Sequence, residues 1–155
     1  MTGFNSKIDS QDCYIEINQD DLVINNKSSQ ISCKALEIDE NINLDIKVSD
    51  SEITPRITFK VLRDEFINLD IKIVLLKQAK LEILDESVYF KGSNIGIHSE
   101  LKESSSFELY RLNKFNQSTE NSYFHKCDLS KDCIFKDFNF TNGSKLMNNE
   151  TIVSL

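Results

Sequence analysis

Residues 39–48 read DENINLDIKV, and residues 64–73 read DEFINLDIKI. The two stretches differ only at their third and last positions and begin 25 residues apart. In each, apolar side chains alternate with polar ones, which is typical of a β-strand with one buried and one solvated face. Similarity at a fixed spacing is typical of stacked repeats, in which each turn of the chain buries a face of its neighbour. The pair therefore points to a β-solenoid with rungs of about 25 residues.

Short alternating segments continue along most of the chain, and they predict an all-β fold. They lie near residues 14–17, 22–24, 31–38, 81–83, 88–90, 95–97 and 107–110. A helix over residues 61–78 is disfavoured by β-branched side chains and by a spacing close to two. Only two clear copies of the repeat occur, fewer than the three or so that a stable solenoid usually needs. The sequence therefore leaves two architectures open, a sandwich or barrel and a short β-solenoid.

The repeated stretches predict which side chains face the core. We expect one shared core to hold the apolar residues Ile42, Leu44, Ile46, Val48, Ile67, Leu69, Ile71 and Ile73. The polar residues between them should face water. In a solenoid the two strands would be parallel neighbours, with Asn43 beside Asn68. In a sandwich or meander that stacking would be absent.

The length of 155 residues fits one domain, since domains commonly hold roughly 100–200 residues. We expect a main β domain over residues 1–112. Residues 113–121 are polar and rich in turn formers, which predicts a loop or linker. Residues 122–155 should form a C-terminal β segment that packs on the main domain.

The charge and the cysteine content indicate which class of partner and which cellular compartment suit the chain. Lys and Arg total 18 against 25 for Asp and Glu, so the net charge is −7. This balance disfavours nucleic-acid binding by phosphate neutralisation and favours a basic partner. No signal peptide or membrane-spanning apolar run is recognisable, which predicts a cytoplasmic protein. The four cysteines are then expected as reduced thiols.

Catalytic and metal-binding motifs are missing from the sequence. No glycine-rich phosphate loop, nucleophile elbow or His-Glu-x-x-His stretch occurs. His125, Cys127 and Cys133 form the only group of soft ligands, but their spacing is not that of a zinc knuckle. The simpler interpretation makes the cysteines small buried hydrophobic residues. We therefore predict no enzyme activity, no cofactor and no metal.

One stretch combines aromatic and basic residues and is the candidate nucleic-acid or partner face. It comprises Phe107, Tyr110, Arg111, Lys114, Phe115, Tyr123 and Lys126. Single-stranded nucleic acid binds where such residues share one face, because bases stack on aromatic rings. The alternative places these aromatic side chains in the core, which fits the acidic balance and the absence of Trp.

Residues 30–48 and 81–98 resemble the β-helical shafts of spike proteins from contractile injection machines, which are built from short alternating strands with few aromatic residues. The resemblance implies a non-enzymatic structural or assembly protein that acts through protein partners or self-association. Exposed strand edges in such a fold favour stacking with other subunits. Two alternatives remain. One is a small acidic binding module of the immunity or inhibitor type for a basic partner. The other is a barrel of the oligonucleotide-binding type that holds single-stranded nucleic acid.

Overall fold

A computed structural model describes residues 12–50, 52–143 and 146–155. The described residues form two β-sheets and no helix, which confirms the all-β prediction. In chain order the strands are β1 (Cys13–Ile17), β2 (Leu22–Asn26), β3 (Ile31–Ile38), β4 (Asn41–Val48), β5 (Arg56–Val61), β6 (Ile67–Leu75), β7 (Lys80–Asp85), β8 (Val88–Tyr89), β9 (Ser93–Leu101), β10 (Ser106–Phe115), β11 (Glu120–Leu129), β12 (Ile134–Asn142) and β13 (Leu146–Ser154).

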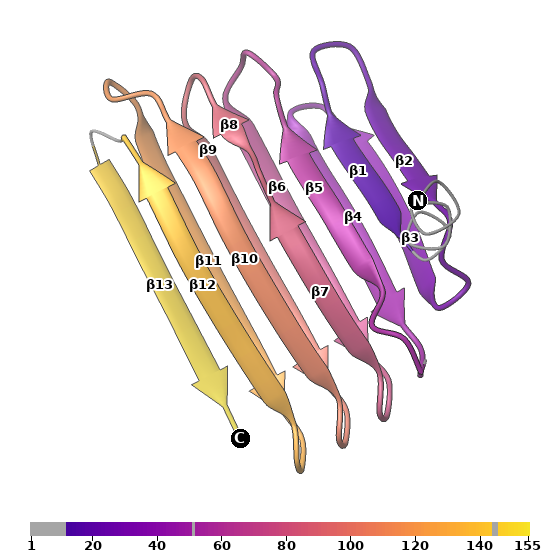
Figure 1. The fold of residues 1–155 in the computed structure, drawn as a ribbon. Coiled ribbons are helices and arrows are strands. Elements are labelled where there is room, and N and C mark those ends of the chain that lie inside the picture. Colours follow the sequence, from indigo (N-terminus) through magenta and orange to yellow (C-terminus); the bar gives the residue numbers. More distant parts are fainter. Residues whose placement is uncertain (1–11, 51, 144–145) are drawn as a thin grey trace, which may run out of the picture.

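The chain is a β-solenoid of about 4 turns with rungs of about 27 residues. Sheet A has the strand order β12-β10-β7-β5-β1-β2, with β8 also beside β10, and sheet B has the order β13-β11-β9-β6-β4-β3. From β4 onward the chain crosses between the sheets at each turn, and from β6 onward each strand except the short β8 pairs in parallel with the strand one rung earlier. Apart from the antiparallel strands β2 and β3, the strands of sheet A run opposite to those of sheet B (Figure 1). The solenoid, and not the sandwich or barrel, is therefore the architecture that this sequence adopts.

The two repeated stretches are parallel neighbours, but their register differs from the expectation. Asn68 pairs with Asn41, and Asn43 pairs with Asp70, so the expected pairing of Asn43 with Asn68 is wrong by two residues. A slide of two residues keeps every side chain on its face, because the side-chain period of a strand is two. Alternation of apolar and polar residues therefore cannot distinguish the two registers. The length of chain that passes through β5 and its turns sets the spacing between β4 and β6 at 27 residues.

This register aligns a row of small polar residues on the outer face of sheet B. The row consists of Asn41, Asn68, Asn94, Ser122 and Asn148. Within it the hydroxyl of Ser122 donates a hydrogen bond of 2.7 Å to Oδ1 of Asn94. The row belongs to the outer surface, and its residues are exposed or half-buried.

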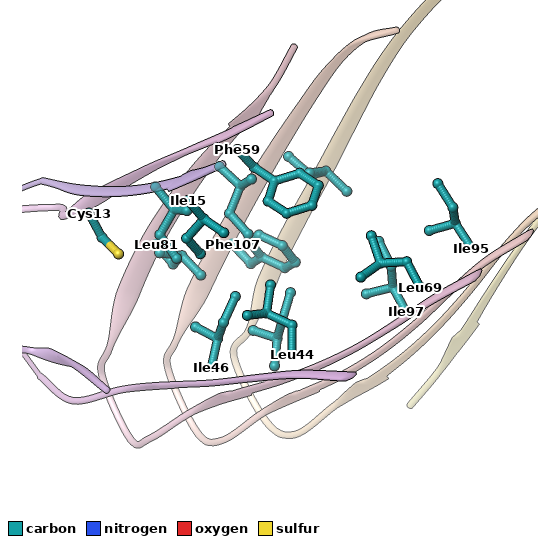
Figure 2. Packing of buried hydrophobic residues seen from close by; sticks show 14 of the residues in the cluster. Cys13, Ile15, Leu44, Ile46, Phe59, Leu69, Leu81, Ile95, Ile97 and Phe107 are labelled. Atoms are coloured by element: carbon teal, nitrogen blue, oxygen red, sulfur yellow. The ribbon is translucent and has the colours of Figure 1, made fainter. Parts of the chain in front are cut away.

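The core is the space between the two sheets (Figure 2). The inward side chains of β4 are all buried, and so are those of β6 except Ile71, which is half-buried. They confirm the predicted faces of both repeated strands. From sheet B, Leu44 and Leu69 point into the layer that Phe59 and Phe107 enter from sheet A. Burial of such apolar surface is the main favourable contribution to folding.

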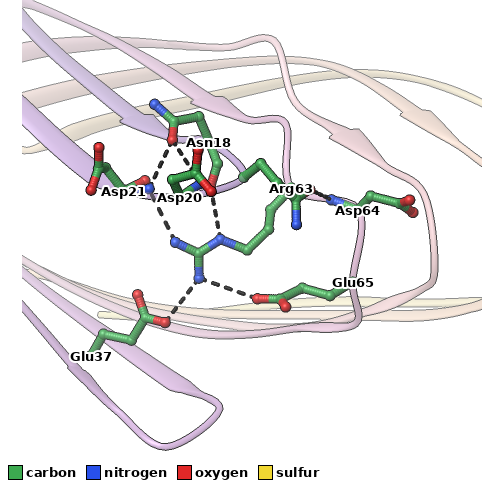
Figure 3. A network of polar contacts seen from close by, with 8 residues as sticks. Asn18, Asp20, Asp21, Glu37, Arg63, Asp64 and Glu65 are labelled. Carbon is green, nitrogen blue, oxygen red and sulfur yellow. Dashed lines mark hydrogen bonds and ion pairs between the residues drawn. The ribbon is translucent and has the colours of Figure 1, made fainter.

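The N-terminal end is closed by antiparallel strands, since β2 pairs with β1 and β3 pairs with β4. Arg63, only 4% exposed, joins these strands to the next rung (Figure 3). Its Nε donates to the carbonyl of Asn18 at 2.8 Å, and its Nη1 lies 2.9 Å from Oε2 of Glu37 and 3.3 Å from Oε1 of Glu65. Charge-assisted hydrogen bonds of this kind are among the stronger ones in proteins, so Arg63 stabilises the contact between the antiparallel N-terminal strands and the next rung.

The stretch predicted as a loop or linker, residues 113–121, contains a short connection flanked by strand residues. Asn113 and Phe115 end β10 with buried side chains, β11 begins at Glu120, and only residues 116–119 lie between the strands. Residues 122–155 then continue the same two sheets through β11, β12 and β13. The main domain and the C-terminal segment of the prediction are parts of one stack.

Candidate protein interface at the C-terminal end

The seven residues of the predicted aromatic and basic face do not form one surface. Four of them, Phe107, Arg111, Phe115 and Tyr123, are buried between the sheets. Tyr110 and Lys114 lie on the outer side of β10 in sheet A, whereas Lys126 lies on the outer side of β11 in sheet B. Strict alternation along β10 and β11 separates neighbours in sequence onto opposite faces. The described fold is also not the barrel that the nucleic-acid alternative assumed.

The last rung of the solenoid leaves two long strand edges open. Within the described residues, β12 pairs only with β10, and β13 pairs only with β11. The amide of Ile134 donates to the carbonyl of Ser105 at 3.1 Å, so alternate residues from Ile134 bond to β10. The backbone N–H and C=O groups of the residues between them, at positions 135, 137, 139 and 141, therefore point to the open edge.

Natural edge strands are usually protected by a proline, a bulge, several charges or a covering segment. Each of these two strands is nine residues long and has an unbroken register with its neighbour. Neither contains proline, and their only charged residues are Lys136, Asp137 and Glu150. Lys136 lies 3.7 Å from Glu108, and Asp137 is held by Arg111, so two of the three charges already have partners. The two strands are thus sparsely charged.

The inward positions become polar toward this end. Residues at the same position of successive rungs form columns along the interior. One column in sheet A consists of Phe59, Asp85, Arg111 and Asn139. One column in sheet B consists of Leu44, Ile71, Ile97, His125 and Thr151. A third column runs through Ile42, Leu69, Ile95, Tyr123 and Asn149. In the last rung Asn139, Asn149 and Thr151 are exposed. These three columns therefore end in polar side chains that face solvent, whereas the inward residues Phe135 and Val153 of the same rung are apolar.

Arg111 organises the rung beneath this row. Its side chain is 2% exposed, and its Nη2 lies 3.1 Å from Oδ2 of Asp137 on the next strand. The guanidinium carbon lies 3.6 Å from the centre of the Tyr123 ring, which is a cation–π contact between the two sheets. Asp85 is the register neighbour of Arg111 on the other side and accepts a 2.5 Å hydrogen bond from the hydroxyl of Ser87. A single buried cation thus stands between two carboxyl groups.

Four buried polar atoms near Arg111 have no hydrogen-bond partner among the described residues. They are Nη1 of Arg111, Nδ1 of His125 and the hydroxyl oxygens of Tyr89 and Tyr123. Three of these side chains stack directly beneath residues of the exposed last rung. Most buried polar groups in proteins are paired, so this rung has hydrogen-bonding capacity that the preceding apolar rungs lack.

Asp85 and His125 have pKa values that burial moves in opposite directions. Burial raises the pKa of Asp85 from 3.8 to about 6, although the Ser87 hydroxyl and Arg111 oppose the shift. Burial, together with the charge of Arg111, lowers the pKa of His125 from 6.5 to about 4. Both groups therefore favour their neutral forms, because a charge in this interior is poorly solvated. The second ring nitrogen of His125, Nε2, lies 2.8 Å from the hydroxyl of Ser99.

These shifts predict opposite pH dependences that nearly cancel in the wild type. Folding holds a proton on Asp85, so the free energy of unfolding falls as pH rises from about 4 to 6. Folding keeps His125 neutral, so its contribution rises as pH increases from about 4 to 6.5. The free energy of unfolding of Asp85→Asn, minus that of wild type, should therefore increase as pH rises through this window. The same difference for His125→Gln should decrease. Urea unfolding across the window measures both slopes, and parallel curves for all three proteins would contradict the assignment.

Apolar side chains flank the open end on the outer faces. Tyr110 stacks on Phe138 with ring centroids 4.9 Å apart, and Phe140, in register with Leu112, is 66% exposed. Ile152 is also exposed on the outer side of β13. Tyr110 belongs to the predicted aromatic and basic face, whereas Phe138 and Phe140 carry no sequence signal for it, because only their pairing with β10 brings them beside Tyr110.

The structure places the three soft ligands in separate roles. His125 and Cys127 are buried on inward positions of β11, whereas the thiol of Cys133 donates to the carbonyl of Lys102 at 2.9 Å. The described part of the chain contains no group of three or more His, Cys, Asp or Glu side chains that is placed to hold a metal ion.

Comparisons with known protein families, with curated proteins and with solved structures find no match for this chain. In the described ranges, no helix has the length and apolar character needed to cross a membrane.

Proposed function

We propose that this chain is a non-enzymatic assembly subunit that binds a protein partner through the C-terminal end of the solenoid. The partner adds β-strands to the open edges of β12 and β13. The observation that carries the proposal is the pair of nine-residue edges, which are unbroken, free of proline and sparsely charged. Added strands are held by main-chain hydrogen bonds, so such an edge is a template for another chain.

The flanking side chains support a protein partner. The exposed rings of Phe138 and Phe140 lie on the outer face of sheet A beside the open edge, so they extend the proposed contact surface. Aromatic residues are enriched in protein interfaces. The adjacent charges are mixed, since Lys136 and Glu108 face each other across the strands. A nucleic acid would instead need a basic face.

Asn139→Pro tests the proposal at the edge itself. The N–H of Asn139 points to the open edge, so proline there removes a donor needed by the partner without removing a bond to β10. Thr141→Lys provides a second variant, because an inward charge on an edge strand opposes strand addition. The matched control is Ala35→Pro in β3, an inward position at the opposite end whose N–H points away from β4 and has no strand beside it among the described residues.

Size fractionation of extracts from the cells in which the chain occurs gives the readout. A tagged wild-type chain should elute well above its mass of 17.9 kDa. Asn139→Pro and Thr141→Lys should elute as monomers, and Ala35→Pro should elute like wild type. Circular dichroism and thermal melting of the purified variants establish that they are folded. Wild-type chain that elutes as a monomer, or an assembly that both C-terminal variants retain, would disprove the proposal.

A further inference from the structure

We infer that the partner at the C-terminal end is a second copy of this chain, joined end to end about a twofold axis. The inference rests on the proposed function, since it identifies the occupant of the same open edges. The two edge strands run in opposite directions, one in each sheet (Figure 1). A twofold axis perpendicular to the solenoid axis therefore places an antiparallel edge against each of them, and both edges of both copies pair at once.

The inward row of the last rung is chemically self-complementary. Its exposed polar members are Asn139 and Thr141 on β12 and Asn149 and Thr151 on β13, and Val153 is an exposed apolar residue on an inward position of the same rung. An amide or a hydroxyl both donates and accepts hydrogen bonds, so a second copy of the row can satisfy the first. The charged inward residue, Asp137, is already bound by Arg111. A twofold dimer interface must be self-complementary, because both copies contribute the same surface to it.

The opposite end does not complement this row, which disfavours head-to-tail stacking into a filament. Its inward side chains, on β2 and β3, are largely apolar and include Leu22, Ile24, Cys33 and Ala35. Polar amides and hydroxyls placed against them would lose water without gaining partners, which is costly. In addition, β2 has only five residues, against nine in β12. The structure therefore points to a closed dimer.

Sedimentation equilibrium of the purified 155-residue chain tests this inference. The wild type should reach twice 17.9 kDa and stay at that mass as concentration rises. Asn139→Pro and Thr141→Lys should lose the dimer, whereas Ala35→Pro should keep it. Hydrogen exchange adds a second readout, because the amides of residues 135, 137, 139 and 141 should become protected only at concentrations at which the dimer forms.

The outcomes separate the two proposals. A purified chain that stays monomeric, although the extract assembly depends on Asn139 and Thr141, overturns the second copy as partner and leaves the assembly function standing. Mass that keeps growing with concentration, or a dimer lost in Ala35→Pro, shows that the N-terminal end takes part and overturns the twofold arrangement. Monomers both in purified form and in the extract overturn both proposals.

Discussion

Replacing Arg111 with methionine is expected to lower the free energy of unfolding by about 3–5 kcal/mol, the usual cost of removing one partner from a buried ion pair. Methionine keeps most of the volume but leaves Asp85 and Asp137 without the cation that lies between them. It also removes the contact of the guanidinium with the Tyr123 ring. Urea unfolding near neutral pH, monitored by circular dichroism, measures the loss.

Arg56 provides a matched control on the outer face of the same sheet. Its Nη2 lies 3.1 Å from Oε1 of Glu82, the same separation as in the pair between Arg111 and Asp137, but its side chain is 47% exposed. Exposed ion pairs contribute about 0–1 kcal/mol, so Arg56→Met should change stability little. If both variants lower the free energy of unfolding by the same amount, burial does not make Arg111 more important than an exposed arginine. The contacts of Arg111 with Asp137 and Tyr123 would then not stabilise the fold as proposed.

Leu69→Ala should lower the free energy of unfolding by about 2–5 kcal/mol, as expected for a core leucine. The Leu69 side chain is 2% exposed and stacks between Ile42 and Ile95 in the middle of sheet B. Alanine at this position removes apolar contacts on both sides and leaves a cavity that close-packed neighbours fill only in part. Thermal and urea unfolding of the purified variant give the measurement.

The neighbouring substitution Asn68→Ala is the control, because it changes the adjacent residue on the opposite face of the same strand. Asn68 belongs to the outer row of small polar residues, where a change to alanine should alter stability by no more than about 0.5 kcal/mol. A larger loss for Asn68→Ala than for Leu69→Ala would mean that the outer row, and not the apolar interior, holds β4, β6 and β9 together.

The repeated strands show how far alternation carries a prediction. On β4 and β6 the eight apolar residues of the repeated stretches were expected inside, and the structure has all of them there, with Ile71 half-buried. On β10 the same reasoning is ambiguous, because Phe107, Leu109 and Phe115 share one face while Tyr110 and Leu112 share the other. Both faces are partly apolar, so pattern alone does not assign Arg111 to the interior. Its partner Asp137 lies 26 residues away on a parallel neighbour and carries no local signal.

By itself the sequence determined the strand content and the buried faces of the clearest strands, because a side-chain period of two is a local property of the backbone. The sequence repeat also indicated a rung of nearly the observed length. Only the tertiary structure decided which strands are neighbours, in which register they pair and which edges remain open. These features depend on how the chain returns after each rung of about 27 residues, and a slide of two residues leaves the alternation unchanged. For the same reason the polar end at β12 and β13 became visible only when the rungs were stacked.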